Sequence, residues 1–115
     1  MTAFVSAGCA EILCLTTADL GFGEAGQACS ATPDRVADWW AAYRPFDVAL
    51  VAPDLSALVL LSVDEFVLVG GSSRFVESAL GTTVDAGRAA FSAYAADMAA
   101  ASRHLPGVAQ RWCRV

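Results

Sequence analysis

The chain has 115 residues, of which 57% are hydrophobic, and its formal net charge is −5 at pH 7. A chain of this length predicts one domain, residues 1–115, that buries enough apolar surface to fold unaided. Its basic residues are all arginines, so Schiff-base, pyridoxal-phosphate and P-loop mechanisms, which need a lysine, are excluded. An acidic chain without a basic run also predicts no nucleic-acid partner, because neutralising phosphates supplies most of the non-specific affinity.

Targeting signals and metal ligands are equally sparse. No uncharged run approaches the roughly 18 residues that span a bilayer, and the first residues lack the basic start of a secretory signal. We therefore expect a cytoplasmic protein with no membrane partner and no resident cofactor.

One histidine cannot complete a Cys2His2 site, and the cysteines show no CxxC spacing. We favour reduced, mostly buried thiols over a disulfide or a metal site for Cys9, Cys14, Cys29 and Cys113.

The N-terminal third predicts a strand followed by a long loop. Residues 9–16 indicate the strand, whereas residues 19–32 are rich in glycine and small side chains. Residues 21–26 match the letters of the dinucleotide-binding pattern GxGxxG. In that motif the third glycine opens a helix, but here the next helix signal comes at Pro33, and Asp47 precedes its strand instead of following one. We therefore interpret the segment as a glycine loop.

A first helix is predicted over residues 33–44. Thr32 is a suitable N-cap, Pro33 fits the first helical turn, and Asp34 favours the positive end of the helix dipole. The helix should end at Arg44, because the residue before a proline avoids the α region. Its apolar stripe, which should cover the sheet, consists of Val36, Trp39, Trp40 and Tyr43.

Three short apolar runs follow, at residues 48–52, 57–63 and 66–69. The short connections at residues 53–56 and 64–65 favour antiparallel neighbours, so these runs predict a meander. Alternate positions are apolar on both sides of each run. A strand with one face in water should alternate apolar and polar residues, so we expect this sheet to be covered on both faces.

The turn Gly70-Gly71-Ser72-Ser73-Arg74 supports two interpretations. As an anion site, it would offer exposed N–H groups at a helix start together with an arginine. In the structural alternative, which we favour, the glycines make the turn and a serine caps a helix over residues 73–80 that Gly81 terminates.

A long final helix is predicted over residues 84–104, ended by Leu105-Pro106-Gly107. His104 would lie at its C-terminal end, where a cation favours the negative end of the dipole, and we prefer this to a general base paired with a cysteine. The core stripe consists of Val84, Phe91, Tyr94, Met98 and Leu105. The opposite side carries small residues that reflect either helix propensity or packing against a second subunit: Ala86, Ala89, Ala93, Ala96 and Ala100, here called the alanine ridge.

Together these elements predict an α+β domain. Its sheet is mostly antiparallel, has three or four strands and includes the meander over residues 48–69. The sheet is packed by helices over residues 33–44, 73–80 and 84–104.

Three functional hypotheses remain open. The leading one is a non-enzymatic protein-binding domain, such as an immunity- or antitoxin-type inhibitor from a GC-rich bacterium, whose acidic face fills a basic cleft. The others are a homo-oligomeric structural or regulatory domain, and a small anionic-ligand binder or enzyme centred on residues 70–74. Under the leading hypothesis the partner contacts are made by Asp34, Asp38, Asp54, Asp64, Glu65 and Trp112.

Overall fold

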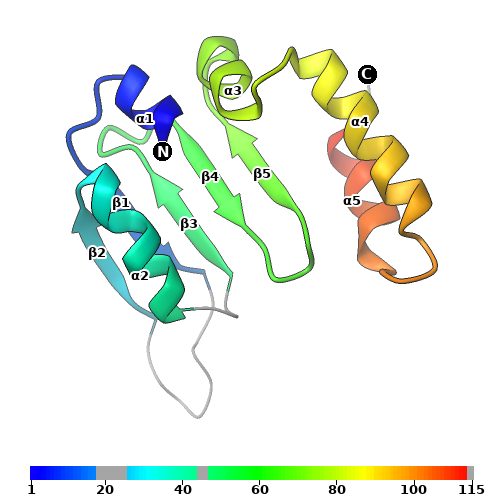
Figure 1. Cartoon of the computed structure of the whole chain (residues 1–115), viewed down its shortest axis with the longest axis horizontal. Coiled ribbons are helices and arrows are strands. Elements are labelled where there is room, and N and C mark those ends of the chain that lie inside the picture. The colour runs from blue at the N-terminus through cyan, green and yellow to red at the C-terminus, as the bar shows by residue number, and fades with distance from the viewer. Residues whose placement is uncertain (18–25, 44–46, 114–115) are drawn as a thin grey trace.

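The computed structural model describes residues 1–17, 26–43 and 47–113 (Figure 1). It has the predicted α+β fold, with a five-stranded sheet in which every neighbouring pair is antiparallel. The strands lie in the order β2-β1-β3-β4-β5 and span Ile12–Thr16 (β1), Ala28–Ala31 (β2), Val48–Val51 (β3), Leu58–Leu61 (β4) and Val67–Gly70 (β5). The helices are α1 (Thr2–Ser6), α2 (Val36–Tyr43), α3 (Ser73–Leu80), α4 (Val84–Asp97) and α5 (His104–Trp112).

The predicted meander is confirmed, because β3, β4 and β5 pair consecutively. The sheet nevertheless has more strands than the three or four expected, since β2 lies within the segment predicted to be a loop. The sequence of β2, Ala-Cys-Ser-Ala, has no apolar alternation, and it is a strand because its backbone pairs with β1. Residues 18–25, which hold most of the glycine loop, lie outside the described residues.

The helix predicted over residues 33–44 begins as a 3-10 turn, Pro33–Arg35, and continues as α2. Thr32 has the extended backbone of an N-cap, but its hydroxyl donates to the Asp34 carboxylate and makes no capping bond to the backbone. The predicted stop at Arg44 lies outside the described residues.

Helix α3 agrees with the prediction at both ends. The Ser72 hydroxyl accepts a hydrogen bond from the Phe75 backbone N–H at 3.1 Å, and Gly81 ends the helix in the left-handed conformation. Gly71 has a φ of 146°, and a Cβ at this position would lie 3.1 Å from the carbonyl oxygen of Ser56. The start of α3 is therefore held against the connection between β3 and β4.

The single helix predicted over residues 84–104 is wrong in its last third. Helix α4 begins at Val84 but ends at Asp97, and α5 begins at His104 and includes Pro106. Proline is tolerated in a first turn because the backbone N–H there has no helical partner, so Pro106 belongs to a helix start. His104 therefore lies at the N-terminal end of a helix, and the dipole interpretation of its position is wrong.

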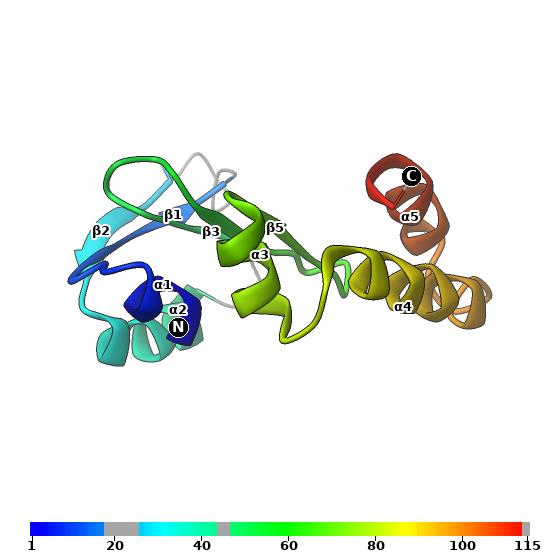
Figure 2. The same ribbon diagram turned by 90° about the horizontal axis from the view of Figure 1, so that it is seen from above.

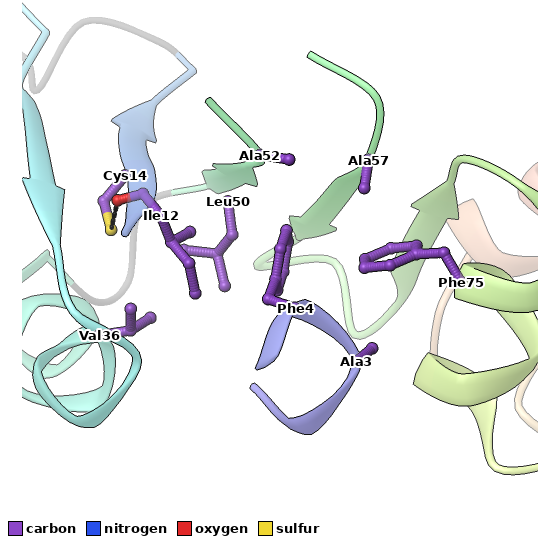
Figure 3. Close-up of a cluster of buried hydrophobic side chains, with 9 residues drawn as sticks. All are labelled: Ala3, Phe4, Ile12, Cys14, Val36, Leu50, Ala52, Ala57 and Phe75. Carbon is purple, nitrogen blue, oxygen red and sulfur yellow. Dashed lines mark hydrogen bonds between the residues drawn. The ribbon is translucent and has the colours of Figure 1, made fainter. Parts of the chain in front are cut away.

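The main core lies between the sheet and helices α1, α2 and α3. We call this side of the sheet the closed face. The rings of Phe4 in α1 and Phe75 in α3 meet edge to face, with their centroids 5.0 Å apart, above strand residues such as Leu50 (Figure 3). The buried cluster comprises Ala3, Phe4, Ile12, Cys14, Val36, Leu50, Ala52, Ala57 and Phe75.

The other side of the sheet carries no helix in the part of the chain that the structure describes (Figure 2). Helices α1, α2 and α3 pack on the sheet from the closed face, with α2 against β1 and α3 against β5, while α4 and α5 extend as a hairpin beyond β5. The expectation of cover on both faces is therefore wrong for the described single chain. The slab is 19 Å thick, which fits one layer of sheet and one of helices at about 10 Å each.

Candidate functional site

The backbone pairing fixes which side chains share the uncovered side of the sheet. Directly opposed residues in an antiparallel pair point to the same side, and the register opposes Leu13 to Val51, Ala49 to Leu60, and Leu60 to Leu68. We call this surface the open face, and it consists of Leu13, Leu15, Ala49, Val51, Leu58, Leu60 and Leu68.

The open face is apolar across four neighbouring strands. Ala49 is 7% exposed because it lies low between larger side chains, whereas Leu58 is 40% exposed. The other members are half-buried, and the helices that contact β1 and β5, α2 and α3, lie on the closed face. On the closed face, by contrast, Leu50 is fully buried. The site is thus an apolar surface with no charged side chain among its members.

Polar groups mark the two ends of the open face. Asp47, which precedes β3, accepts hydrogen bonds from the Val63 backbone N–H at 2.6 Å and from the Ser62 hydroxyl at 3.3 Å. At the other end, Asp54 accepts from the backbone N–H of Ser56 at 3.0 Å and from its hydroxyl at 2.6 Å. These bonds, the hydroxyl first, lower the pKa of Asp54. An apolar centre with a polar rim is the usual anatomy of a protein interface.

The acidic residues proposed for partner contact do not gather on one surface. Asp34 and Asp38 lie in the turn and helix that cover the closed face. Asp54 lies in the connection before β4 and Asp64-Glu65 in the connection after it, so these carboxylates stand at opposite ends of the strand. The hydroxyl of Thr32 lowers the pKa of Asp34, which is fully exposed. The structure therefore shows scattered carboxylates instead of a single acidic face.

The C-terminal hairpin holds the other residues proposed for contact. Trp112 lies beyond the predicted end of the last helix at residues 105–107, but it is the last residue of α5. It is half exposed and has the Arg111 guanidinium 5.2 Å from its ring centroid. The members of the alanine ridge are all exposed, and Ala100 lies beyond the end of α4. The buried alanine of this helix is Ala95, which is not part of the ridge, and α4 contacts α5.

The turn at residues 70–74 has the local structure of the favoured alternative. Ser72 caps α3, so its hydroxyl already holds one of the N–H groups that an anion would use. Ser73 and Arg74 are exposed in the first turn.

Chemically reactive groups are few in the described part of the chain. His104 Nε2 lies 3.9 Å from Asp64 Oδ1, and both side chains are largely exposed. Cys14 is buried opposite Cys29 across β1 and β2, and its burial, with the Cys29 thiol adding to the effect, raises its pKa to about 11. Such a thiol stays protonated at neutral pH and is a poor nucleophile. No three His, Cys, Asp or Glu side chains among the described residues are placed to hold a metal ion.

A region of the closed face is incompletely filled. A hollow of about 420 Å³ lies between α1, α3, β4 and β5, and its walls include Val59, Leu61 and Leu80. Val67, which is 51% exposed, also lines it. The hollow has no cluster of charged or convergent polar groups, which a small-molecule site needs to orient its ligand.

Comparison with known proteins finds no family model, curated protein or solved structure that matches the chain. Within the described residues, no helix is both long and apolar enough to cross a bilayer. The site is therefore argued from its own geometry. Sequence reasoning did not name the open face as a site, although the signal was present in the two-sided apolar pattern of residues 48–69.

Proposed function

We propose that this protein is a non-enzymatic protein-binding domain whose contact surface is the open face of its sheet. The observation that carries the proposal is a layer of leucines and valines on β1, β3, β4 and β5 with no described helix over it. An antiparallel sheet that faces water normally presents polar side chains on that side. Large contiguous apolar patches on soluble proteins mark sites of interaction.

The chemistry of the open face favours a polypeptide as its occupant. The surface has no charged member, and the carboxylates at its ends already accept hydrogen bonds, Asp47 from Val63 and Asp54 from Ser56. A small ligand needs a concave pocket with convergent polar groups, and a nucleic acid needs basic side chains. An apolar layer from another chain needs neither, because burying apolar area drives the association.

Site-specific photo-crosslinking in the producing cell tests this proposal. A benzophenone amino acid is placed at Leu58 on the open face or, as a matched control, at Val67, which has similar exposure on the closed face. We expect a discrete polypeptide adduct, identified by mass spectrometry, from position 58 and little from position 67. Absence of an adduct at position 58, or equal yields of the same adduct from both positions, would contradict the proposal.

A further inference from the structure

We propose that Cys14 and Cys29 form an oxidation site, at which a peroxide converts the two thiols into a disulfide bond between strands β1 and β2. The site lies on the closed face, so the proposal does not depend on the proposed function of the open face. Three observations support it: the strand register, the proximity of the two thiols and the difference in exposure between them.

The strand register places the two cysteines directly opposite each other. Cys14 in β1 pairs with Cys29 in β2, and opposed residues of an antiparallel pair point to the same side of the sheet. The Cα atoms of such a pair are about 4.5 or 5.5 Å apart, depending on the hydrogen-bonding pattern. Both separations lie within the roughly 4.4–6.8 Å that a disulfide bridges. No other two cysteines are opposed in the strands that the structure describes.

The two thiols are also near enough to interact. Burial first, and then the Cys29 thiol, by charge interaction and a side-chain hydrogen bond, raise the pKa of Cys14 to about 11. Cys14 belongs to the buried cluster of the closed face, and its thiol lies 3.6 Å from the carbonyl oxygen of Ile12 (Figure 3). Both cysteines are free thiols in the structure, so the pair is available for oxidation.

The difference in exposure sets the order of the reaction. Cys29 is exposed, contrary to the expectation of mostly buried thiols, whereas Cys14 is fully buried, so a peroxide reaches Cys29 first. The Cys29 sulfur attacks one oxygen of hydrogen peroxide, the O–O bond breaks, and the products are a sulfenic acid and one water.

The second step joins the two strands. The Cys14 sulfur attacks the Cys29 sulfur, an S–S bond forms, and the hydroxyl group leaves with the Cys14 proton as a second water. The two thiols together lose two electrons, which reduce one peroxide to two waters. Cys14 is a poor nucleophile toward a free reagent, but here its target is held beside it by the register, which replaces a bimolecular encounter.

The bond would fix the edge of the sheet. β2 is an edge strand that pairs with β1, and three of its four residues are exposed, so it buries little apolar area. A covalent link to β1 opposes local opening of β2. It also closes a loop of roughly 15 residues in the unfolded chain, which favours the folded state.

Peptide mapping of the purified chain after brief treatment with hydrogen peroxide tests the proposal. Free thiols are blocked with N-ethylmaleimide, and the denatured protein is cleaved after its glutamates, which places the four cysteines in four different peptides. We expect one cross-link, between peptides 12–24 and 25–65, while Cys9 and Cys113 carry the blocking group. Oxidation should raise the urea midpoint by about 1–2 M and should slow hydrogen exchange in β2 at least about tenfold.

The matched control moves one thiol to the other side of the sheet. The double variant Cys29→Ser/Ser30→Cys keeps the number of thiols, but residue 30 opposes Leu13 of the open face, so no cross-link to Cys14 should form. A second control, Cys14→Val, should leave Cys29 oxidised but unlinked and the urea midpoint unchanged. Circular dichroism checks that both variants keep their fold.

Four outcomes overturn the proposal. They are a natural chain in which Cys14 stays blocked and unlinked, a cross-link that joins Cys9 or Cys113 instead, an equal yield of cross-link in the double variant, and an equal rise of the urea midpoint in Cys14→Val.

Discussion

The two faces of the sheet are built from the same residue types but have different surroundings. On the closed face Ile12, Cys14 and Leu50 are fully buried under α1, α2 and α3, whereas their open-face neighbour Leu13 is half-buried and Leu58 is 40% exposed. The apolar pattern that makes a strand thus does not specify what covers it. Cover can come from a helix of the same chain or from another chain, and the difference is measurable.

The largest expected effect comes from truncating one leucine on each face. Leu50→Ala removes a fully buried side chain and should lower the free energy of unfolding by about 3 kcal/mol. Leu60→Ala removes a half-buried one and should cost about 1 kcal/mol or less in a single chain. Urea denaturation of the natural chain and of both variants measures the two losses. Equal losses would mean that the two faces are equally buried and would remove the contrast.

Raising the pH should lower the free energy of unfolding by an intermediate amount, because the Cys14 thiol on the closed face loses its proton only at high pH. The folded-state pKa of Cys14 is about 11, above the ordinary value of 9.0, so the folded chain holds this proton more tightly than the unfolded chain. The resulting stability is fully present below pH 9 and is lost as the pH rises toward 11. The loss should be on the order of 1 kcal/mol.

Urea midpoints at pH 8, 10 and 11 measure this loss, with Cys14→Val as the control because it keeps an apolar side chain in the same place. The variant should lose stability less steeply over that range. Identical pH dependence in both proteins would show that the Cys14 thiol is less shielded from water than its position on the closed face requires.

The smallest effect concerns the connection between β3 and β4, at the edge where both faces meet. Leu55 is 75% exposed and has a φ of 63°, a left-handed conformation that costs a leucine about 1 kcal/mol. Leu55→Gly relieves that cost but gains freedom in the unfolded chain, so the net stabilisation should be a few tenths of a kcal/mol. Thermal unfolding of the natural chain and of the variant measures it, and Leu55→Asn should behave similarly. A loss of stability would show that the leucine side chain makes a contact of its own.

The sequence predicted correctly those elements whose ends are set by residues close to them in the chain. Helix α3 was predicted at both ends because the Ser72 cap and the left-handed Gly81 act within a few residues of the helix they bound. The meander was predicted because short turns leave antiparallel pairing as the simple solution. Strand β2 was missed because Ala28–Ala31 has no pattern of its own, and its structure depends on pairing with a distant segment.

The break between α4 and α5 could not be read from propensity, since residues 98–103 include strong helix formers. Pro106 was read as a stop although it lies in a first turn, where proline is equally acceptable. The sequence showed the apolar pattern of the open face, but the open face was not identified as a site. Strands that are apolar on both sides need a packing layer on each face of the sheet. Hydrophobic periodicity does not reveal whether the second layer belongs to the same chain. The acidic residues proposed for partner contact do not lie on one surface of the fold, and their positions in space cannot be read from the sequence.

The order of strands implies how the sheet assembles during folding. β3, β4 and β5 are joined by a few residues each, so their pairing and the docking of α3 close short loops at low entropic cost. The central pairing of β1 with β3 brings Thr16 to Val48 and must close the whole intervening segment, including β2 and α2. We therefore expect the C-terminal half of the sheet to nucleate the domain and β1 to dock last, which φ-value analysis of Leu60 and Leu13 would resolve.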